Sequence, residues 1–463
     1  MKKFLLFALI LILPACTVGP KYRRPPVSIP QAYRGQTTKT ATTAAASLGA
    51  EKWWTVFQDP VLVQLIHTAL ARNYDVRIAA TRVLQAQALL GITRANQFPY
   101  VSAGAGLFSQ KNPKTSKALP ANEVNAGRLN LSVIWDLDFW GKYRSETEAA
   151  RAEILASEWG QRAVLSSLVA SVASAYFQLR ALDSQFTIAK RTLATRQDSL
   201  HLVQVLEKNG SASMLDVTQA EQLVDVAAES IPDLERQIAQ QENSLSILLG
   251  ENPGPIPRGR PLIEQPVPPE VPAGLPSELL ARRPDVCEAE ENLIAANAQI
   301  GVLKAALFPD ISLTGTGGFE SYALNNLISG PSKMWNAAIN VAQPVFAAGA
   351  LRAGERLAQA QWQQMVLSYQ QTIQQAFGQV SNAIIGYQKN REFRRQQQRL
   401  TQAARESDQL SVVLYRNGGA SFLQVLTSET NYFAAELDLV QAQLNERLAL
   451  VQLYQALGGG WQQ

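Results

Sequence analysis

Hydrophobic and polar residues alternate most strictly between Arg128 and Trp140. A two-residue period places the apolar side chains on one face and predicts a β-strand. The weaker, glycine-rich pattern of residues 100–110 predicts its hairpin partner, across a polar loop at 111–127. Together these segments predict a β-hairpin at about 100–140. The apolar positions are Leu129, Leu131, Val133, Trp135, Leu137 and Phe139, and the polar positions are Asn130, Ser132, Asp136 and Asp138.

The second half of the chain repeats this arrangement at 311–319 and 335–346, which predict a hairpin at about 310–347. Apolar strands with aromatic ends are typical of a lipid-facing band, and about 9–11 tilted residues cross a bilayer. An ordinary amphipathic sheet on a soluble core is the alternative. The membrane interpretation is favoured because nothing else in the sequence supplies strands for such a sheet. The aromatic residues at the strand ends are Trp135, Phe139, Trp140, Trp335 and Phe346.

Two hairpins give each chain only four strands. An open sheet edge is not tolerated in lipid, and closed membrane barrels are built from more strands than this. The strand count therefore predicts that several copies of the chain share one barrel.

A longer period marks the segment after each hairpin. From Leu165 onward, apolar residues recur at alternating spacings of three and four, which is the 3.5-residue repeat of a supercoiled helix pair. The pattern predicts a long helix at 145–206, a tight turn and a returning helix at 214–249. Such a long helix would extend roughly 90 Å. Ser145 and Glu148 predict a capping box at its start.

Nearly the whole chain is a tandem duplication. Repeat 1 is expected at 59–250 and repeat 2 at 277–458, so the second pair of helices is expected at 352–415 and 422–457. Three stretches carry the correspondence: Leu206–Val217 recurs as Leu414–Val425, Ala71–Val76 as Ala281–Val286, and Phe98–Pro99 as Phe308–Pro309.

Each repeat is expected to begin with a helix. In repeat 1, Asp59 is a favourable N-cap and Pro60 a favourable first helical residue, and the helix is expected to run to about Gln97. The proline-rich connector at 251–276 is expected to be extended, since its prolines exclude helix and central strand. Residues 459–463 are expected to be a C-terminal tail.

The N-terminus predicts export. Residues 1–15 combine two lysines with a short apolar run that ends at small residues, which indicates a signal peptide. The Leu-Pro-Ala-Cys sequence ending at Cys16 resembles a lipobox, which would leave Cys16 as a lipidated first residue of an extended segment, 16–58. Thr17 in place of Asp favours the outer membrane as destination. The alternative is an ordinary cleaved signal peptide followed by an incidental cysteine.

Composition excludes several classes of function. The formal net charge of +4 is too small to indicate a nucleic-acid-binding protein. The only histidines, His67 and His201, occupy unrelated positions of the repeats, so no histidine-based metal or catalytic site is expected. Cys287 has no second thiol to pair with once Cys16 is acylated, so no intrachain disulfide is expected. After the signal peptide, no run of ~18 apolar residues predicts a transmembrane helix.

Four segments together resemble the outer membrane factor (TolC-like) family, and within it the lipoprotein branch. They are Cys16–Tyr22, Leu275–Asp285, Phe308–Pro309 and the duplicated Asn-Gly-x-Ala-Ser-x-Leu turn. The resemblance implies an α+β membrane protein that forms a homotrimer. Three chains would contribute four strands each to a twelve-stranded outer-membrane β-barrel, which a long α-helical coiled-coil barrel would continue into the periplasm.

The same resemblance implies a function and partners. The chain would be the outer-membrane channel of a tripartite efflux pump, a passive gated duct for drugs or other toxic small molecules. Its partners would be a periplasmic adaptor protein and an inner-membrane pump of the RND type, with outer-membrane lipid around the barrel and no nucleic acid. No enzymatic activity, metal or cofactor is implied, apart from the covalent lipid on Cys16.

The two turns between helices are expected at the periplasmic end of the duct. Glycines there permit a tight left-handed turn. This structural role and recognition by the adaptor are equally good explanations for the two glycines. The expected docking residues are Asn209, Gly210, Ser211, Ala212, Ser213, Asn417, Gly418, Gly419, Ala420 and Ser421. The gate candidates are Asp216, Glu207, Lys208, Tyr415, Arg416 and Asp408.

The main alternative is a periplasmic coiled-coil lipoprotein that supports the envelope without conducting anything. The alternating strands argue against it, because a scaffold does not need aromatic-flanked strands with a polar reverse face. An enzyme is a more distant alternative. Asp136 and Asp138 share one face but would line water within a barrel.

Overall fold

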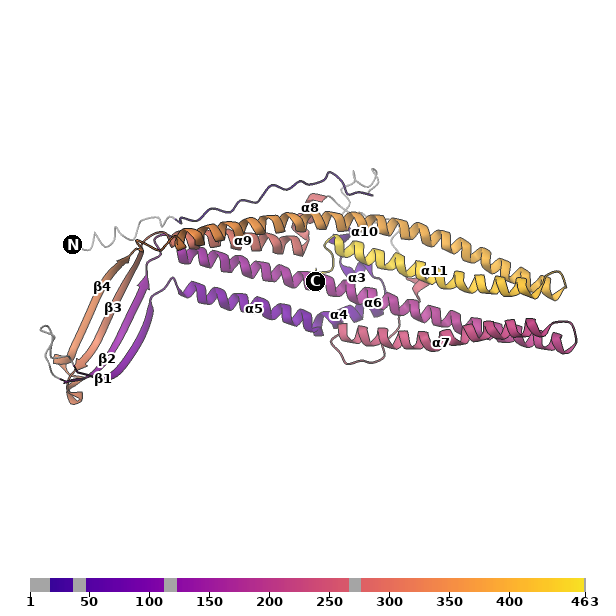
Figure 1. The fold of residues 1–463 in the computed structure, drawn as a ribbon, viewed down its shortest axis with the longest axis horizontal. Coiled ribbons are helices and arrows are strands. Elements are labelled where there is room, and N and C mark those ends of the chain that lie inside the picture. The colour runs from indigo at the N-terminus through magenta and orange to yellow at the C-terminus, as the bar shows by residue number, and fades with distance from the viewer. Residues whose placement is uncertain (1–16, 36–46, 112–122, 266–275, 462–463) are drawn as a thin grey trace. The chain divides into compact units, whose positions relative to one another are not determined.

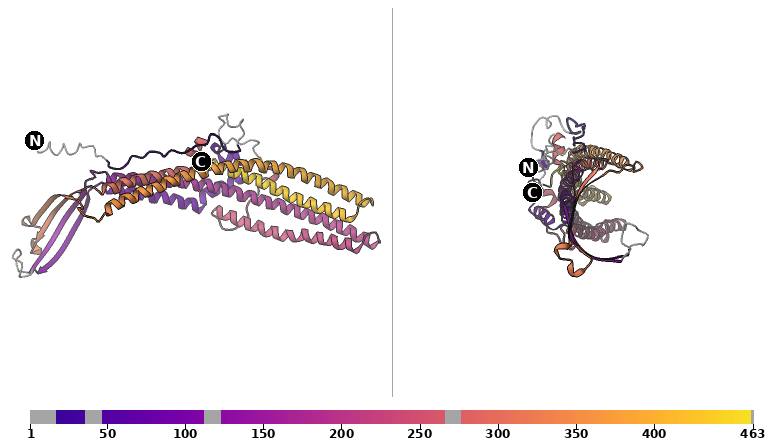
Figure 2. Two further views of the ribbon diagram at one scale, coloured as in Figure 1. Left: turned by 45° about the horizontal axis from the view of Figure 1, so that its top comes forward. Right: turned by 90° about the vertical axis from the view of Figure 1, so that its left-hand side faces the viewer.

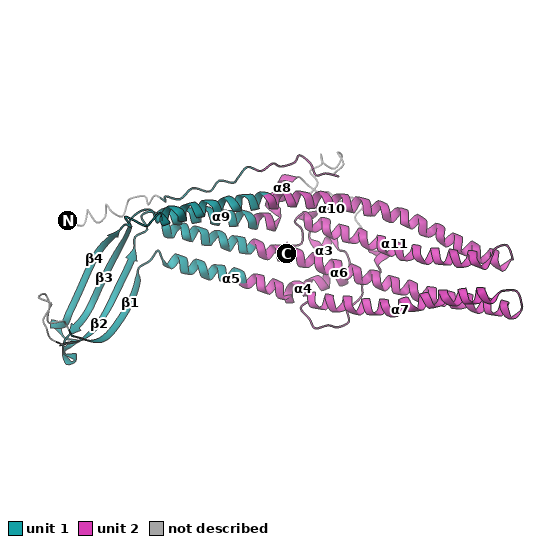
Figure 3. Cartoon of the chain, viewed as in Figure 1, with its two compact units in different colours: residues 1–26, 82–158, 288–370 teal, residues 27–81, 159–287, 371–463 magenta. Residues whose placement is uncertain are grey.

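The computed structural model of the chain describes residues 17–35, 47–111, 123–265 and 276–461 (Figure 1). Cys16 and the tip of the first hairpin lie outside these residues. The chain divides into two compact units (Figure 3). One unit comprises residues 1–26, 82–158 and 288–370 and contains the sheet; the other comprises residues 27–81, 159–287 and 371–463.

The sheet has four antiparallel strands in the order β1-β2-β3-β4. Both views in Figure 2 show the strands as one curved layer. The central pairing, β2 with β3, joins a strand of repeat 1 to a strand of repeat 2. The strands are β1 (Tyr100–Lys111), β2 (Glu123–Asp136), β3 (Asp310–Ser321) and β4 (Lys333–Ala342), with short 3-10 turns at Leu324–Asn326 and Gly330–Ser332.

The register separates an apolar face from a polar face. Leu131 pairs with Ala103 and Gly317, and Trp335 pairs with Gly317 on the same face. Side chains on this face are open to the surroundings: Leu131 is 58% exposed and Trp335 83% exposed. The opposite face carries small polar residues such as Ser102, Asn130, Ser132, Thr314, Thr316, Asn336 and Asn340. Most side chains on both faces of the sheet are therefore exposed or half-buried, with little of the described chain packed over them.

The last strand ends earlier than its sequence pattern suggests. β4 stops at Ala342, and Phe346 lies beyond it. Pro344 lacks the N–H that a further ladder bond would need, so the strand cannot continue through it.

Aromatic residues anchor the strand ends that adjoin the helices. The Trp135 Nε1–H donates to the Gln97 carbonyl at 3.1 Å, and the Trp140 Nε1–H donates to the Pro309 carbonyl at 2.8 Å. The Trp140 ring stacks on Phe308, with centroids 4.8 Å apart. These indoles therefore join the end of β2 to Gln97 in repeat 1 and to Pro309 in repeat 2 of the same chain.

The helices of the two repeats have matching lengths. Helices α6 and α10 each have 67 residues, and α7 and α11 each have 35. Their ends lie within three residues of the bounds expected from the heptad pattern. The helices are α6 (Lys142–Lys208), α7 (Met214–Leu248), α10 (Ala350–Arg416) and α11 (Phe422–Ala456), with α3 (Trp53–Val56), α4 (Pro60–Arg72), α5 (Tyr74–Ala95), α8 (Pro276–Arg282) and α9 (Pro284–Ala305).

The expected single helix from Pro60 to about Gln97 is wrong, because Asn73 divides it into α4 and α5. The Asn73 Oδ1 accepts hydrogen bonds from the N–H groups of Asp75 at 2.8 Å and Val76 at 3.3 Å, and so caps α5. Its Nδ2 donates to the Leu248 carbonyl at 3.0 Å. The break therefore depends on a contact with a distant helix end.

The expected capping box at Ser145 is also wrong, because α6 begins earlier, at Lys142. Asp138 caps the helix instead: its carboxylate accepts from the N–H of Tyr143 at 3.2 Å and of Arg144 at 3.0 Å. The Asp136 carboxylate accepts from the Tyr143 hydroxyl at 2.8 Å. Both carboxylates thus form hydrogen bonds in the turn from strand to helix. The expectation that they only line water was therefore incomplete.

The segments expected to be extended contain short helical pieces. A 3-10 turn at Leu48–Ala50 and α3 precede α4, and a 3-10 turn at Leu262–Glu264 lies in the connector. Trp53 of α3 is fully buried. No helix among the described residues is long and apolar enough to cross a membrane.

Asp59 ties three parts of the chain together. Its Oδ1 accepts from the Val61 N–H at 2.9 Å and caps α4. Its Oδ2 accepts from the Tyr176 hydroxyl at 2.8 Å and from Gln265 Nε2 at 2.5 Å. Burial alone would raise the pKa of Asp59, but the hydrogen bonds from Gln265, Tyr176 and the backbone outweigh it and lower that pKa. A Cβ at Gly259 would lie 2.3 Å from the Asp59 Oδ1, so the connector approaches the carboxylate as only glycine allows.

Replacement of this carboxylate should destabilise the helical unit. Asp59→Ala removes the α4 cap and leaves the Tyr176 hydroxyl and one of the two amide N–H groups of Gln265 without an acceptor, which we expect to cost about 3–5 kcal/mol. Tyr176→Phe, the matched control, removes the bond to Asp59 and the bond accepted from the Gly259 N–H at 3.0 Å, and should cost about 2 kcal/mol. Thermal unfolding of the purified protein, followed by circular dichroism, measures both. Equal shifts in Tm for the two variants would contradict the central role of Asp59.

Candidate functional site at the two helical turns

The turns after α6 and α10 have the same backbone geometry. Gly210 has φ +73° and Gly418 has φ +74°, in the left-handed region that side chains with a Cβ disfavour. In the first turn, the N–H of Gly210 donates to the Glu207 carbonyl at 2.9 Å and the N–H of Ser211 to the Leu206 carbonyl at 2.8 Å. The second turn has equivalent bonds at Gly418 and Gly419. This pair of bonds is the Schellman motif, which satisfies the last carbonyls of each helix.

Side chains reinforce each turn in the same way. Asn209 and Asn417 both donate through Nδ2 to a carbonyl four residues earlier, in each case at 2.7 Å. Because the backbone and side-chain bonds are duplicated, the turn residues have a structural reason for their identity in both repeats.

The returning helices differ in the residue that completes the cap. The Asp216 carboxylate accepts from the Ser213 N–H at 2.9 Å, and the Gln424 Oε1 accepts from the Ser421 N–H at 3.1 Å. The carboxylate oxygen of Asp216 and the amide oxygen of Gln424 thus each accept the backbone N–H of the N-cap serine. The difference between Asp216 and Gln424 therefore leaves the cap intact while removing one charge.

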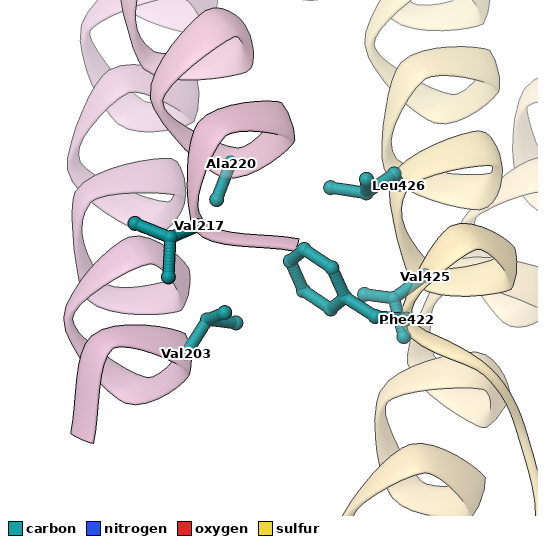
Figure 4. Packing of buried hydrophobic residues seen from close by; sticks show 6 residues of the cluster. All are labelled: Val203, Val217, Ala220, Phe422, Val425 and Leu426. Atoms are coloured by element: carbon teal, nitrogen blue, oxygen red, sulfur yellow. The ribbon is translucent and has the colours of Figure 1, made fainter. Parts of the chain in front are cut away.

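A small hydrophobic cluster joins the two helix pairs beside the turns (Figure 4). Partly buried Tyr415 packs against it, and its ring lies 5.4 Å from the ring of Phe422, centroid to centroid. The cluster holds α7 and α11 together within one chain. Its buried members are Val203, Val217, Ala220, Phe422, Val425 and Leu426.

Two of the gate candidates come together at this cluster. Burial raises the pKa of the Tyr415 phenol, and the nearby negative charge of Asp216 raises it further. Tyr415 belongs to repeat 2 and Asp216 to repeat 1, so this proximity links the two turns. Glu207, Lys208 and Arg416 take part in none of the ion pairs found among the described residues.

Asp408 lies in a separate polar layer together with residues that the sequence patterns did not single out. Arg196 is almost fully buried, donates through Nη1 to the Leu223 carbonyl at 2.8 Å and lies 5.0 Å from the centre of the Phe433 ring. The Ser199 hydroxyl donates to Glu429 at 3.1 Å. Arg196, Glu429 and Phe433 line a cavity of about 120 Å³ together with Asp408.

Burial dominates the electrostatics of this layer. It raises the pKa of Asp408, an effect that Glu436 reinforces, and it lowers the pKa of Arg196. It also raises the pKa of Glu429. The heptad pattern held a signal for this layer, because the alternation of three and four that ends at Leu193 continues to Arg196.

Within the described ranges, no group of three or more His, Cys, Asp or Glu side chains is arranged to hold a metal ion. What the two turns provide is a pair of hydrogen-bonded loops, one small apolar cluster and charged side chains without an ion-pair partner in the described part of the chain.

Known proteins resemble this chain along nearly its full length. A family model described as outer membrane efflux protein matches residues 65–251 and 275–459. The cation efflux system protein CusC of Escherichia coli O6:H1 is 35% identical over 462 residues, covering 100% of this chain and 99% of CusC. The probable efflux pump outer membrane protein TtgC of Pseudomonas putida is 37% identical over 458 residues, covering 97% of this chain and 94% of TtgC.

The fold has a close match among solved structures. The open state of the Neisseria gonorrhoeae MtrE outer membrane channel superposes with a TM-score of 0.87 at 30% identity, covering 96% of this chain and 99% of MtrE.

These matches confirm the α+β membrane fold expected from the sequence, in which each chain supplies four strands to an outer-membrane barrel continued by a periplasmic helical barrel. They confirm the outer membrane as its location and its role as an efflux channel component, and they exclude the non-conducting scaffold and the enzyme. The chain belongs to the outer membrane efflux protein family.

Proposed function

We propose that three copies of this chain form one passive, gated exit duct across the outer membrane. The observation that carries this proposal is the two-sided sheet, whose apolar face suits lipid and whose polar face suits a water-filled lumen. Three chains with four strands each give twelve strands and remove every open edge. The duct performs no bond chemistry and couples no energy, so a pump must drive transport through it.

The duct would work in a tripartite system with a periplasmic adaptor and an inner-membrane pump of the RND type. The system would export drugs or other toxic small molecules, and the relation to CusC also makes metal cations candidates. The pump selects the cargo, because a wide duct discriminates little. The adaptor would dock on the two turns, Asn209–Ser213 and Asn417–Ser421, most of whose residues are exposed and whose backbone is held by the hydrogen bonds described above.

The gate would lie at these turns. Opening requires the helix pairs to separate, and the pairs are linked within one chain by the cluster around Phe422 and by the proximity of Tyr415 and Asp216. Glu207, Lys208 and Arg416 lack ion-pair partners in the described part of their own chain, so they would act between neighbouring copies. Asp408 would belong to the polar layer that supports these turns.

Lipid on Cys16 would supplement the barrel as a membrane anchor. The Val18 N–H donates to the Trp140 carbonyl at 3.2 Å, and Trp140 follows the end of β2 closely. A lipid two residues before Val18 would therefore start near the periplasmic end of the strands, where the inner leaflet lies. This proximity supports the lipobox interpretation of residues 13–16.

Loss of the gene should sensitise the host to exported compounds. We expect at least one class in a panel of drugs, bile salts and metal salts to inhibit the deletion strain at a lower concentration than the wild type. Complementation with the intact gene should restore tolerance. Uniform wild-type tolerance across the panel would count heavily against an efflux role.

Truncation of a gate residue should leave the closed duct leaky. Arg416→Ala removes a charge that we assign to contacts between copies, and it should raise single-channel conductance in planar bilayers. Arg399→Ala, an exposed arginine on the same helix, is the matched control and should conduct like the wild type. Unchanged closed-state conductance would remove Arg416 from the gate.

A bulky residue on a turn should block the adaptor without unfolding the chain. Ser211 is exposed, so Ser211→Trp should abolish adaptor cross-linking and lower drug tolerance. Gly210→Ala introduces no contact within 4 Å and adds only backbone strain of about 1–2 kcal/mol. It should therefore lower Tm while adaptor cross-linking persists. Normal cross-linking by Ser211→Trp would contradict docking at this turn.

A further inference from the structure

The polar face of the sheet carries one charged pair away from its periplasmic end. Arg128 of β2 pairs in register with Glu320 of β3, on the face that also bears Asn130 and Thr316. Other charges of this face, Asp136 and Asp310, lie at the strand ends that adjoin helices. The strand positions between these two regions are small or neutral, so Arg128 and Glu320 are isolated from other charges along the face.

The geometry fixes both side chains. The Arg128 Nε–H donates to the Glu320 Oε2 at 2.9 Å, and Arg128 Nη2 lies 2.8 Å from the same oxygen. The guanidinium also lies 5.8 Å from the centre of the Phe108 ring, which shares the polar face. Phe108 is one of the apolar residues on this mostly polar face, and here its ring lies beside the arginine.

Both charges remain in contact with solvent. The side chain of Arg128 is 46% exposed and that of Glu320 is 30% exposed. Glu320 is the penultimate residue of β3, next to the β3–β4 connection and far along the strand from α9. An exposed ion pair contributes little to stability, so its presence here calls for another role.

We propose that Arg128 and Glu320 form a charge-compensated ring in the outer part of the barrel lumen and set its ion selectivity. This inference rests on the proposed trimeric duct, in which the pair occurs three times around one axis. Rings of carboxylates favour cations and rings of arginines favour anions. Pairing of the two in each chain keeps the ring neutral, so that compounds of either charge can leave the duct.

The test is the reversal potential of single channels in planar bilayers under a KCl gradient. Glu320→Gln leaves three unpaired arginines and should raise the chloride-to-potassium permeability ratio, by about twofold at 0.1 M salt and up to about eightfold at low salt. Arg128→Gln should lower the ratio to a similar extent. The double variant and the exchanged pair, Arg128→Glu with Glu320→Arg, should both return to the wild-type value.

Arg128→Lys is the matched control, because it keeps the charge but loses the second nitrogen that contacts Glu320 Oε2 and the contact with Phe108. It should conduct with wild-type selectivity, which separates an effect of charge from an effect of local structure. Conducting channels in which neither glutamine variant shifts the ratio, or in which both shift it the same way, would overturn the inference alone. Failure of the wild type to form any channel would overturn the proposed duct as well.

Discussion

The outer edges of β1 and β4 carry backbone N–H and C=O groups that no described strand of the same chain pairs with. Hydrocarbon offers such groups no partner, and each unsatisfied group costs several kcal/mol. A chain with these two edges and an exposed apolar face cannot remain a monomer in a bilayer. Oligomerisation and a polar lumen both follow from this one requirement, because several copies must pair their edges to close the sheet, and its polar face then turns inward.

Local patterns in the sequence were sufficient to predict the elements that depend on periodicity. The alternation around Leu131 predicts a strand because neighbouring side chains point to opposite faces, whatever the strand packs against. The heptads likewise predict α6 and α10. Features that depend on distant contacts were missed: Asn73 breaks a helix partly through the Leu248 carbonyl, and Asp138 displaces Ser145 as the cap of α6.

The site was predicted to a similar extent. The turns were evident because their sequence is duplicated, and the structure gives both copies the same bonds. The polar layer of Arg196 and Glu429 was missed because a helical stripe does not reveal which charges face each other across two helix pairs. The exchange of Asp216 for Gln424 shows how duplicated units diverge: the capping bond persists while the charge is lost, so electrostatics can change without loss of fold.

The pairing of β2 with β3 also constrains how the molecule is made. Gly127 bonds in register with Ser321, so the centre of the sheet joins residues synthesised far apart in time. Contacts of such high sequence separation slow folding, since the loop between them must be closed first. During secretion, the first hairpin must therefore wait with its apolar face and both strand edges exposed. Such an intermediate is prone to aggregate, and biogenesis of this chain should depend on periplasmic chaperones that shield the hairpin until repeat 2 arrives.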